Sequence, residues 1–308
     1  MNTRLAYVIN PAAAAGRTPA RWQTARTELW RRGLAGAEFV PPTAHDGVDL
    51  ARRAAADADV LVAVGGDGTV SEVASGLLQA GAPARLAILP LGTANDLASQ
   101  LGIRTLTAAI DLIPNGQTRT IDAIEVRCSQ NPSTPVRHAL SFVCLGFAGE
   151  VLRQTTPAIK RWFGPRWCYS VGFLRALASC RRPNVRVRAD QATFRGRWLH
   201  ICAGNLEWAG GGIMRLSPGA QCADGLFDVC LIEAMPRLAI AWHFPKLLGG
   251  SFVRHPRARY FRGTQLVLET ETPETIHIDG DMAGFTPAHL CIRPRCLHLL
   301  APSGTGHS

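Results

Sequence analysis

Short apolar runs alternate with amphipathic segments over the first third of the chain. The runs at 60–64 and 85–89 are rich in aliphatic residues and end beside glycine or proline, which is typical of buried parallel strands. The pattern predicts strands at 5–9, 38–40, 60–64 and 85–89, and helices at 19–32, 45–56, 70–79, 95–101 and 106–113. This alternation predicts a parallel sheet with helices on both faces, in which ligands bind at the carboxyl ends of the strands.

After about residue 120 the pattern changes to strand-like runs separated by turn residues. The runs are IDAIEVRC, HALSFVCLGF, NVRVRAD, RWLHICAGN, LFDVCLIE, QLVLETET, TIHIDGD and LCIRP. Such a succession predicts an antiparallel sheet or sandwich, and residues 157–179 are the main helical exception. The expected fold is therefore an N-terminal Rossmann-like α/β domain and a C-terminal antiparallel β-sandwich domain, with a boundary near residue 122.

The charge balance favours anionic partners. The 308 residues carry a net charge of +10, almost wholly from arginine. Such a surplus suits nucleotides, acidic phospholipid headgroups or nucleic acid, but no nucleic-acid recognition motif is present. We therefore expect no nucleic-acid partner, and a homodimer is an arrangement that the sequence leaves open.

The cysteine pattern and the N-terminus indicate a cytoplasmic protein. Nine cysteines occur without a CxxC pair or a regular framework, so a reducing compartment is expected. No signal peptide and no membrane-spanning stretch is apparent. A cluster near the C-terminus suggests zinc, but its alternating pattern favours ordinary strand packing. Its members are His289, Cys291, Cys296 and His298.

Three loops of small residues follow predicted strands and precede predicted helices. They are NPAAAAGR at 10–17, GGDGT at 65–69 and LPLGTANDLA at 89–98. A strand, a glycine turn and a helix in that order present free backbone N–H groups, where a phosphate can bind. Asp67 beside phosphates needs a positive partner, and Mg²⁺ is expected there. Thr93 can donate its hydroxyl to a phosphate, while Asn95 or Asp96 can cap the helix that follows.

A pair of acids follows a late strand in IHIDGDMAG at 276–284. Asp279 and Asp281 flank a glycine there. Paired acids at a turn bind a metal, accept a proton from a hydroxyl, or form a hairpin. For this motif alone, the hairpin is the favoured interpretation.

Taken together, these stretches resemble the diacylglycerol and sphingosine kinase superfamily, specifically the soluble bacterial lipid kinases. The resemblance rests on GGDGTVSEVASGL, ILPLGTANDLASQLGI and HIDGDMAGFTPAHLCIRP in that order and spacing, and it covers nearly the whole chain. GGDGT alone is shared with NAD kinases and phosphofructokinases. The combination of GTAND with a late DG-acid motif makes the lipid kinase interpretation specific.

The resemblance implies a nucleotide domain at 1–122, completed by the returning segment at about 288–308. A β-sandwich lipid-substrate domain follows at 123–287, and the active site lies in the cleft between the two domains. By resemblance, ATP contacts the loops named above and one threonine after the second strand. The implied residues are Asn10, Pro11, Ala12, Ala13, Ala14, Thr43, Gly65, Gly66, Asp67, Gly68, Thr69, Val70, Ser71, Gly92, Thr93, Asn95 and Asp96.

The resemblance also implies the catalytic groups. The acid that ends the DG-acid motif is the general base, which is Asp281 here, supported by Asp279, while Asp67 and Asp279 organise Mg²⁺. The family usually has glutamate at the base position. Aspartate is one methylene shorter, so its carboxylate lies about 1.5 Å back, a displacement that can cost about 100-fold in rate.

Two further stretches have two interpretations each. By resemblance, a structural metal loop maps onto Gln221, Asp224 and Leu226, and the alternative is a plain DG turn between strands. Residues 160–183 mix aromatic and basic side chains. This stretch is either the mouth of a lipid pocket that touches acidic headgroups or a core helix with a solvated basic face.

The sequence therefore favours an ATP- and Mg²⁺-dependent lipid kinase that meets its substrate at a membrane surface. One alternative is a lipid- or nucleotide-binding protein with weakened catalysis. It is suggested by DGD in place of DGE, and by a first loop without the family's usual serine and glycine. A second alternative is a NAD kinase-like enzyme with a soluble acceptor, which predicts a polar pocket in the second domain.

Overall fold

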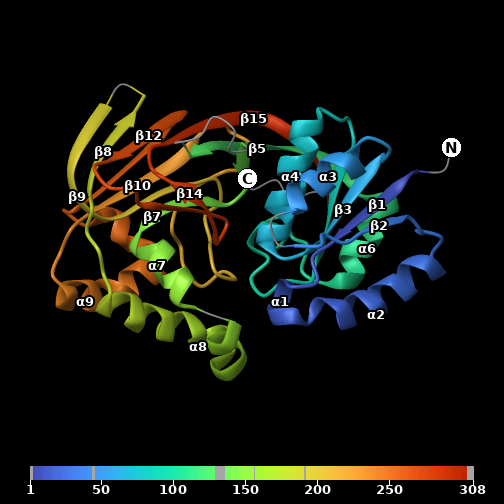
Figure 1. Cartoon of the computed structure of the whole chain (residues 1–308), viewed down its shortest axis with the longest axis horizontal. Helices are drawn as coiled ribbons and strands as arrows, with labels where there is room; N and C mark the ends of the chain where they lie inside the picture. The colour runs from blue at the N-terminus through green and yellow to red at the C-terminus, as the bar shows by residue number, and fades with distance from the viewer. Residues whose placement is uncertain (1–2, 44–45, 129–135, 156, 191, 304–308) are drawn as a thin grey trace. The chain divides into compact units, whose positions relative to one another are not determined.

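Buried apolar runs form the strands of two units, into which the chain divides (Figure 1). The computed structural model describes residues 3–43, 46–128, 136–155, 157–190 and 192–303. One unit comprises Met1–Ile121 and Arg295–Ser308, and the other comprises Asp122–Pro294. The sequence places the corresponding boundaries near residues 122 and 288.

The first unit is built on a parallel sheet. Its strands are β1 (Leu5–Ile9), β2 (Ala37–Phe39), β3 (Val60–Gly65) and β4 (Arg85–Pro90), in the order β4-β3-β1-β2. Every residue of β1 and β3 is buried, as expected of central parallel strands covered on both faces. The four predicted strands are confirmed, and the end of β15 (Ala288–Ala301) adds a parallel neighbour to β4.

Helices connect these strands. They are α1 (Ala13–Gly16), α2 (Thr18–Arg31), α3 (Gly47–Ala55), α4 (Asp67–Ala80), α5 (Asp96–Gln100) and α6 (Leu106–Asn115). The five predicted helices are confirmed, but α4 begins at Asp67 rather than at residue 70. The preceding Gly66 is extended, so the helix starts directly after the glycine pair. Its first amides therefore lie at the carboxyl end of β3.

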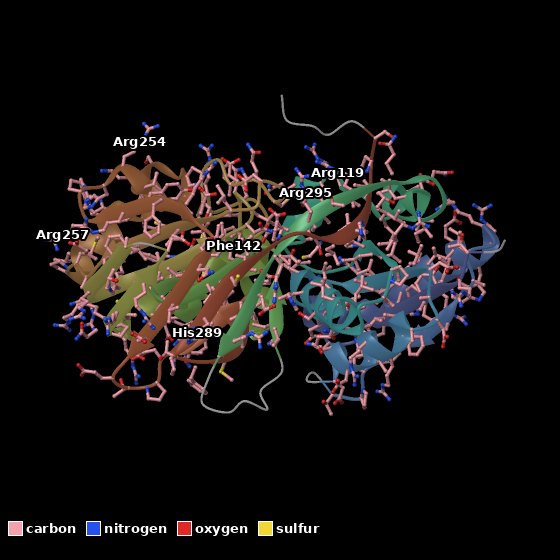
Figure 2. All side chains as sticks on the ribbon, turned by 90° about the horizontal axis from the view of Figure 1, so that it is seen from above. Arg119, Phe142, Arg254, Arg257, His289 and Arg295 are labelled. Atoms are coloured by element: carbon pink, nitrogen blue, oxygen red, sulfur yellow. The ribbon has the colours of Figure 1, made fainter. Side chains whose placement is uncertain are left out.

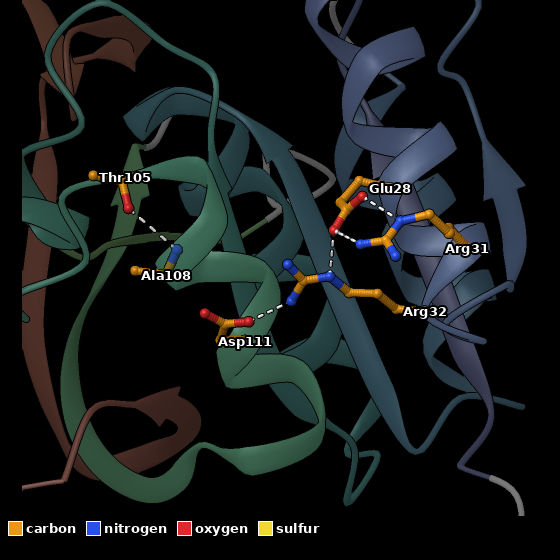
Figure 3. A network of polar contacts seen from close by, with 6 residues as sticks. All are labelled: Glu28, Arg31, Arg32, Thr105, Ala108 and Asp111. Atoms are coloured by element: carbon orange, nitrogen blue, oxygen red, sulfur yellow. Dashed lines mark hydrogen bonds and ion pairs between the residues drawn. The ribbon is translucent and has the colours of Figure 1, made fainter.

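A polar network on the surface of the first unit connects α2 to α6 (Figure 3). Glu28 accepts hydrogen bonds from Arg31 (2.7 Å) and Arg32 (2.6 Å), and Arg32 also pairs with Asp111 on α6. These hydrogen bonds lower the pKa of Glu28 to about 2. Because the side chains are largely exposed, the network orients the helices more than it stabilises them.

The second unit contains two layers of strands. One sheet has the order β14-β13-β7-β9-β10-β11, and all its pairs are antiparallel. The first half of β9 continues into a second layer of order β8-β12-β15-β5-β6. The strands are β5 (Gln117–Cys128), β6 (Arg137–Ala139), β7 (Phe142–Gly146), β8 (Asn184–Ala189), β9 (Ala192–Gly204), β10 (Phe227–Glu233), β11 (Ala258–Gly263), β12 (Gln265–Thr270), β13 (Thr275–Ile278) and β14 (Asp281–Phe285).

One hydrophobic core lies between these layers, which confirms the predicted sandwich. Alternate residues of β7, such as Val143 and Leu145, enter this core together with Ile201 and Ala203 of β9. Since side chains alternate across a strand, the residues between them point to the opposite face.

Three helices cover that opposite face: α7 (Phe147–Gln154), α8 (Pro157–Ala178) and α9 (Arg237–Leu248) (Figure 1). The short 3-10 helix η1 (Ser251–Arg254) follows α9. Helix α7 contacts β7, β9 and β13, and α8 contacts α9. Among the described residues, no helix combines the length and the apolar character needed to cross a membrane.

The structure differs from the sequence pattern in two ways. The pattern does not predict the helices α7 and α9 or the short strands β11 and β14. In α9 the segment RLAIAWHFPKLL is apolar on most sides, so its helical period is weak. A proline often interrupts a strand, yet β15 runs continuously through Pro294, and the next residue, Arg295, has a positive φ of 48°.

Candidate active site

Three loops of the first unit meet at the carboxyl ends of adjacent strands. The amide of Asn10, after β1, donates to Val64 O at 3.1 Å. After β4, the amides of Leu91 and Gly92 both donate to Gly65 O at 2.9 Å. These bonds join the NPAAAAGR, GGDGT and LPLGTAND loops into one surface, as the parallel sheet predicts.

Two glycines permit this close approach. A Cβ on Gly92 would lie 2.3 Å from the Cα of Gly66, and a Cβ on Gly65 would lie 2.3 Å from Oγ1 of Thr69. Contacts this short are not tolerated, so any larger residue would push the loops apart. The glycines therefore leave the backbone itself as the surface of the loops, which suits an anionic ligand.

Asn10 and Asn95 each fold their own loop. The side-chain oxygen of Asn10 accepts from the amide of Ala12 at 2.9 Å, and that of Asn95 accepts from the amide of Gly92 at 3.1 Å. Asn95 has a left-handed conformation with φ 56°. Its side chain does not cap α5, so the expected capping role is wrong for this residue, while Asp96 occupies the first turn.

Asp67 is a strongly perturbed acid of the first unit. Its carboxylate accepts from the amide of Leu97 at 3.3 Å. Burial, reinforced by the negative charge of Asp96, raises the pKa of Asp67 to about 7, although backbone amides of the α5 turn oppose the shift. Two carboxylates that disfavour each other's charge form a set of oxygen ligands that suits a divalent cation.

The remaining residues of the predicted nucleotide site differ in their solvent exposure. Thr69, Val70 and Ser71 are buried. Thr93 is half-buried, and Thr43 is exposed with its hydroxyl donating to Asp46 at 2.7 Å. In the first loop Pro11 and Ala12 are exposed, Ala13 is half-buried and Ala14 is buried, while Gly68 is half-buried.

One residue of this loop surface is missing from the sequence-based set. Arg21 on α2 donates from Nη1 to Leu91 O at 3.2 Å, next to Gly92. This contact links the helix after the first loop to the third loop. No motif marks the arginine, because its position follows from the packing of α2 against the sheet.

The two acids of the DGD motif lie on a hairpin of the second unit. Asp279 and Gly280 both have positive φ, at 48° and 98°, as a two-residue hairpin turn requires. The carboxylate of Asp279 accepts from the amides of Leu140, Ser141 and Phe142 at 2.7–2.9 Å. Asp279 therefore anchors the turn, and Asp281 stands exposed at the start of β14.

The predicted metal loop has the bonds of a turn. The Asp224 carboxylate accepts from the amide of Leu226 at 3.1 Å and pairs with Arg262 at 3.5 Å. The neighbouring amide of Gly225 donates to Asp122 at 2.7 Å, and Gln221 is exposed. These contacts fit the alternative of a DG turn.

The C-terminal histidines do not form a buried cluster. His289 and His298 are exposed on β15, and Figure 2 shows His289 at the surface of the second unit. Cys291 and Cys296 are half-buried in the same strand. Ordinary strand packing accounts for all four.

An apolar pocket lies beneath the helices of the second unit. Its lining comes from α7, α8, α9, η1 and the sheet. Phe173 stacks on Phe244 with ring centroids 3.9 Å apart and meets Phe147 at 5.4 Å. The sequence did not identify this pocket, because its walls come from distant helices.

Comparison with known proteins identifies the family. Residues 4–126 match the diacylglycerol kinase catalytic domain. Residues 141–301 match the YegS C-terminal NAD kinase beta sandwich-like domain. The chain belongs to the diacylglycerol kinase family of lipid kinases. Its expected class, a phosphotransferase, is thereby confirmed.

Curated relatives and solved structures agree with this membership. The lipid kinase chain is 26% identical to the diacylglycerol kinase of Staphylococcus epidermidis over 305 residues, covering 98% of this chain and 93% of the relative. For Staphylococcus aureus the identity is 26% over 306 residues, covering 98% and 94%. A diacylglycerol kinase structure from Bacillus anthracis aligns with TM-score 0.71 at 20% identity, covering 98% and 97%. Yeast NADH kinase shares the fold, with TM-score 0.52 at 13% identity, covering 98% and 85%.

Replacing Gly92 by alanine should disrupt the loop surface of this lipid kinase. The new Cβ collides with Gly66, so we expect a destabilisation of about 1–3 kcal/mol and a clear loss of nucleotide affinity. Urea unfolding and titration with a fluorescent nucleotide measure the two effects. Gly196→Ala is the control, because no atom lies within 4 Å of its added Cβ. Unchanged affinity in Gly92→Ala would contradict the assignment of these loops.

Replacing Asp67 by asparagine should stabilise the protein in the absence of divalent cations. The raised pKa means that Asp67 favours folding at low pH and that this contribution is lost as pH rises through about 7. We expect a gain of about 1–3 kcal/mol at pH 8, and a smaller one at pH 5, by urea unfolding in EDTA. Asp49→Asn, an exposed acid on α3, should change little. If Asp67→Asn were less stable than wild type at pH 8, the ionised carboxylate would not be unfavourable in the folded protein.

Proposed function

We propose that this protein transfers the γ-phosphoryl group of ATP to a hydroxyl of a diacylglycerol-like or sphingoid lipid. The observation that carries the proposal is the junction of three glycine loops at the carboxyl ends of β1, β3 and β4. Backbone amides gathered at one edge of a parallel sheet suit a polyphosphate. The predicted nucleotide residues then act mainly through their backbone.

Asp67 and Asp96 are the residues that would hold Mg²⁺. Both supply carboxylate oxygens, the ligand type that this ion prefers, and burial together with the negative charge of Asp96 raises the pKa of Asp67. The ion would neutralise charge on the phosphates as it develops during transfer. The expected participation of Asp279 stays a prediction; both of its oxygens accept backbone hydrogen bonds within the second unit.

Asp281 is the proposed general base. In the transfer, a bond forms between the lipid hydroxyl oxygen and the γ-phosphorus, and the bond from that phosphorus to the ADP oxygen breaks. Asp281 accepts the hydroxyl proton. Asp279 positions Asp281 through the hairpin turn. The exposed carboxylate of Asp281 is accessible to a substrate.

Two features of the second unit support a lipid acceptor. The first is the pocket beneath α7, α8 and α9, whose lining is almost wholly apolar. This apolar lining favours a lipid acceptor over the soluble acceptor of a NAD kinase-like enzyme, which needs a polar pocket. Hydrocarbon chains gain stability from such walls, whereas the nicotinamide and ribose groups of a dinucleotide do not.

The second feature is a set of exposed apolar side chains on α8 and α9. The exposed fractions are 81% for Trp162, 65% for Leu174, 87% for Leu238 and 81% for Trp242. Basic side chains accompany them: Lys246 is exposed on α9, and Figure 2 shows Arg254 and Arg257 at the surface of the second unit. Apolar and basic groups together suit peripheral docking on a membrane with acidic headgroups.

Phosphoryl transfer tests the proposal directly. Wild-type protein with γ-labelled ATP and Mg²⁺ should label one lipid in a mixed-micelle panel, and Asp281→Ala should lower kcat by about 100-fold or more. Asp49→Asn serves as the control. Label in NAD would favour the soluble-acceptor alternative. Label that appears only with Asp281→Glu would favour a binding protein whose shortened acid limits catalysis.

The docking surface has its own test. The double variant Trp242→Ala, Leu238→Ala should sediment less with vesicles of acidic phospholipid and show a raised KM for vesicular lipid. Its kcat toward a short-chain lipid in solution should remain unchanged. Val40→Ala, which removes an exposed apolar side chain of the first unit, is the control. Equal vesicle binding by both variants would place the docking surface elsewhere.

A further inference from the structure

A row of thiols and imidazoles lies on the helix-covered face of the second unit. His277 pairs with Cys144 across β13 and β7, Cys144 pairs with Cys202 across β7 and β9, and Cys202 pairs with Cys230 across β9 and β10. His200, two residues before Cys202, points to the same face. Four adjacent strands thus place chemically reactive side chains in line, away from the sandwich core.

Three of these side chains converge. The sulfur atoms of Cys144 and Cys202 are 3.5 Å apart. A ligand atom from each of Cys144, His200 and Cys202 lies within 4.8 Å of the other two. All three residues are buried, with exposed fractions of 4%, 4% and 0%. The proposed catalytic acids play no part in this group.

His200 supplies an independent observation. Neither ring nitrogen of this buried side chain forms a hydrogen bond of standard geometry, and the polar group that interacts with the ring is the backbone of Leu145. Leaving a buried polar atom unpaired is costly, and nearly all such atoms in folded proteins have a partner.

We propose that Cys144, His200 and Cys202 bind a thiophilic divalent cation of the zinc type. Two thiolates and a neutral imidazole cancel the charge of such an ion, so the bound site is neutral within an apolar layer. Binding releases two thiol protons to solvent. A hard ion such as Mg²⁺ prefers oxygen ligands and is not the occupant.

The geometry is close to what zinc needs. With Zn–S bonds of about 2.3 Å and tetrahedral angles, two sulfur ligands lie about 3.8 Å apart, against 3.5 Å here. A sulfur and a nitrogen ligand lie about 3.6 Å apart, so side-chain adjustments of roughly 1 Å complete the set. Cys230, next to Cys202 in the row, is a further buried thiol for the fourth position.

Helix α7 covers the thiol and imidazole row, and the apolar pocket beneath the helices reaches it at His200. Gly149 of α7 packs on His277, since a Cβ there would lie 2.3 Å from the imidazole. His200 also lines the apolar pocket beneath α7, α8 and α9. An ion bound at this point would clamp β7 to β9 where the helices rest, and would stabilise the wall of the pocket.

Cobalt substitution tests the site on the full-length protein. Reduced, chelator-treated protein is titrated with Co²⁺ in excess Mg²⁺, which occupies oxygen sites. We expect one Co²⁺ per chain with thiolate-to-cobalt charge-transfer absorption and the visible bands of tetrahedral cobalt, both removed by one equivalent of Zn²⁺. Absence of the charge-transfer absorption in wild type would overturn the proposal, irrespective of any variant.

Variants then assign the ligands. Cys144→Ser and Cys202→Ser should each weaken Zn²⁺ binding by more than about 100-fold and lose the Zn²⁺-induced rise in Tm. Cys291→Ser, a half-buried thiol on β15, is the matched control and should bind as wild type does. Retained charge-transfer absorption in the Cys144→Ser, Cys202→Ser double variant would overturn the assignment. The assignment would also be overturned if protein incubated with the metal under air contained a Cys144–Cys202 disulfide and no bound metal.

Discussion

The backbone contact between Gly66 and Gly92 determines the arrangement of the first unit's site. Parallel strands place their carboxyl ends at one edge of the sheet, but side chains normally keep the following loops apart. With no Cβ at either position, the β3 and β4 loops touch. Their first helical residues, Asp67 and Asp96, then come close enough to affect each other's ionisation. A steric property of two glycines thus becomes an electrostatic property of the site.

Strand alternation has the same organising role in the second unit. One set of residues on β7, β9 and β10 fills the sandwich core, and the intervening set faces α7, α8 and α9. The intervening set holds Cys144, Cys202 and Cys230, which are small and soft enough to lie beneath closely packed helices. The same face carries the apolar pocket. The pocket and the thiol row therefore share one layer of the second unit.

Sequence reasoning succeeded where local patterns determine the result. The βα alternation, the sandwich strands and the DGD hairpin all follow from short-range periodicity or turn chemistry. It failed where tertiary packing decides. The apolar helix α9 lacks a clear period, Arg21 reaches Leu91 only through helix packing, and the pocket joins residues from separate helices. The family resemblance identified functional motifs, but it did not reveal that Asn95 folds its own loop instead of capping α5.

The carboxylates of the proposed chemistry differ in what surrounds them, and this difference separates their roles. Asp279 has both oxygens satisfied by three backbone amides, so its charge is already compensated and it serves the turn. Asp67 also accepts backbone amide hydrogen bonds, but burial and the neighbouring charge of Asp96 outweigh them and raise its pKa. Uncompensated charge of this kind is costly to folding and is retained where a ligand supplies the missing partner. These surroundings support the proposal that Asp67 meets a cation, while the hydrogen bonds of Asp279 hold the turn that precedes Asp281.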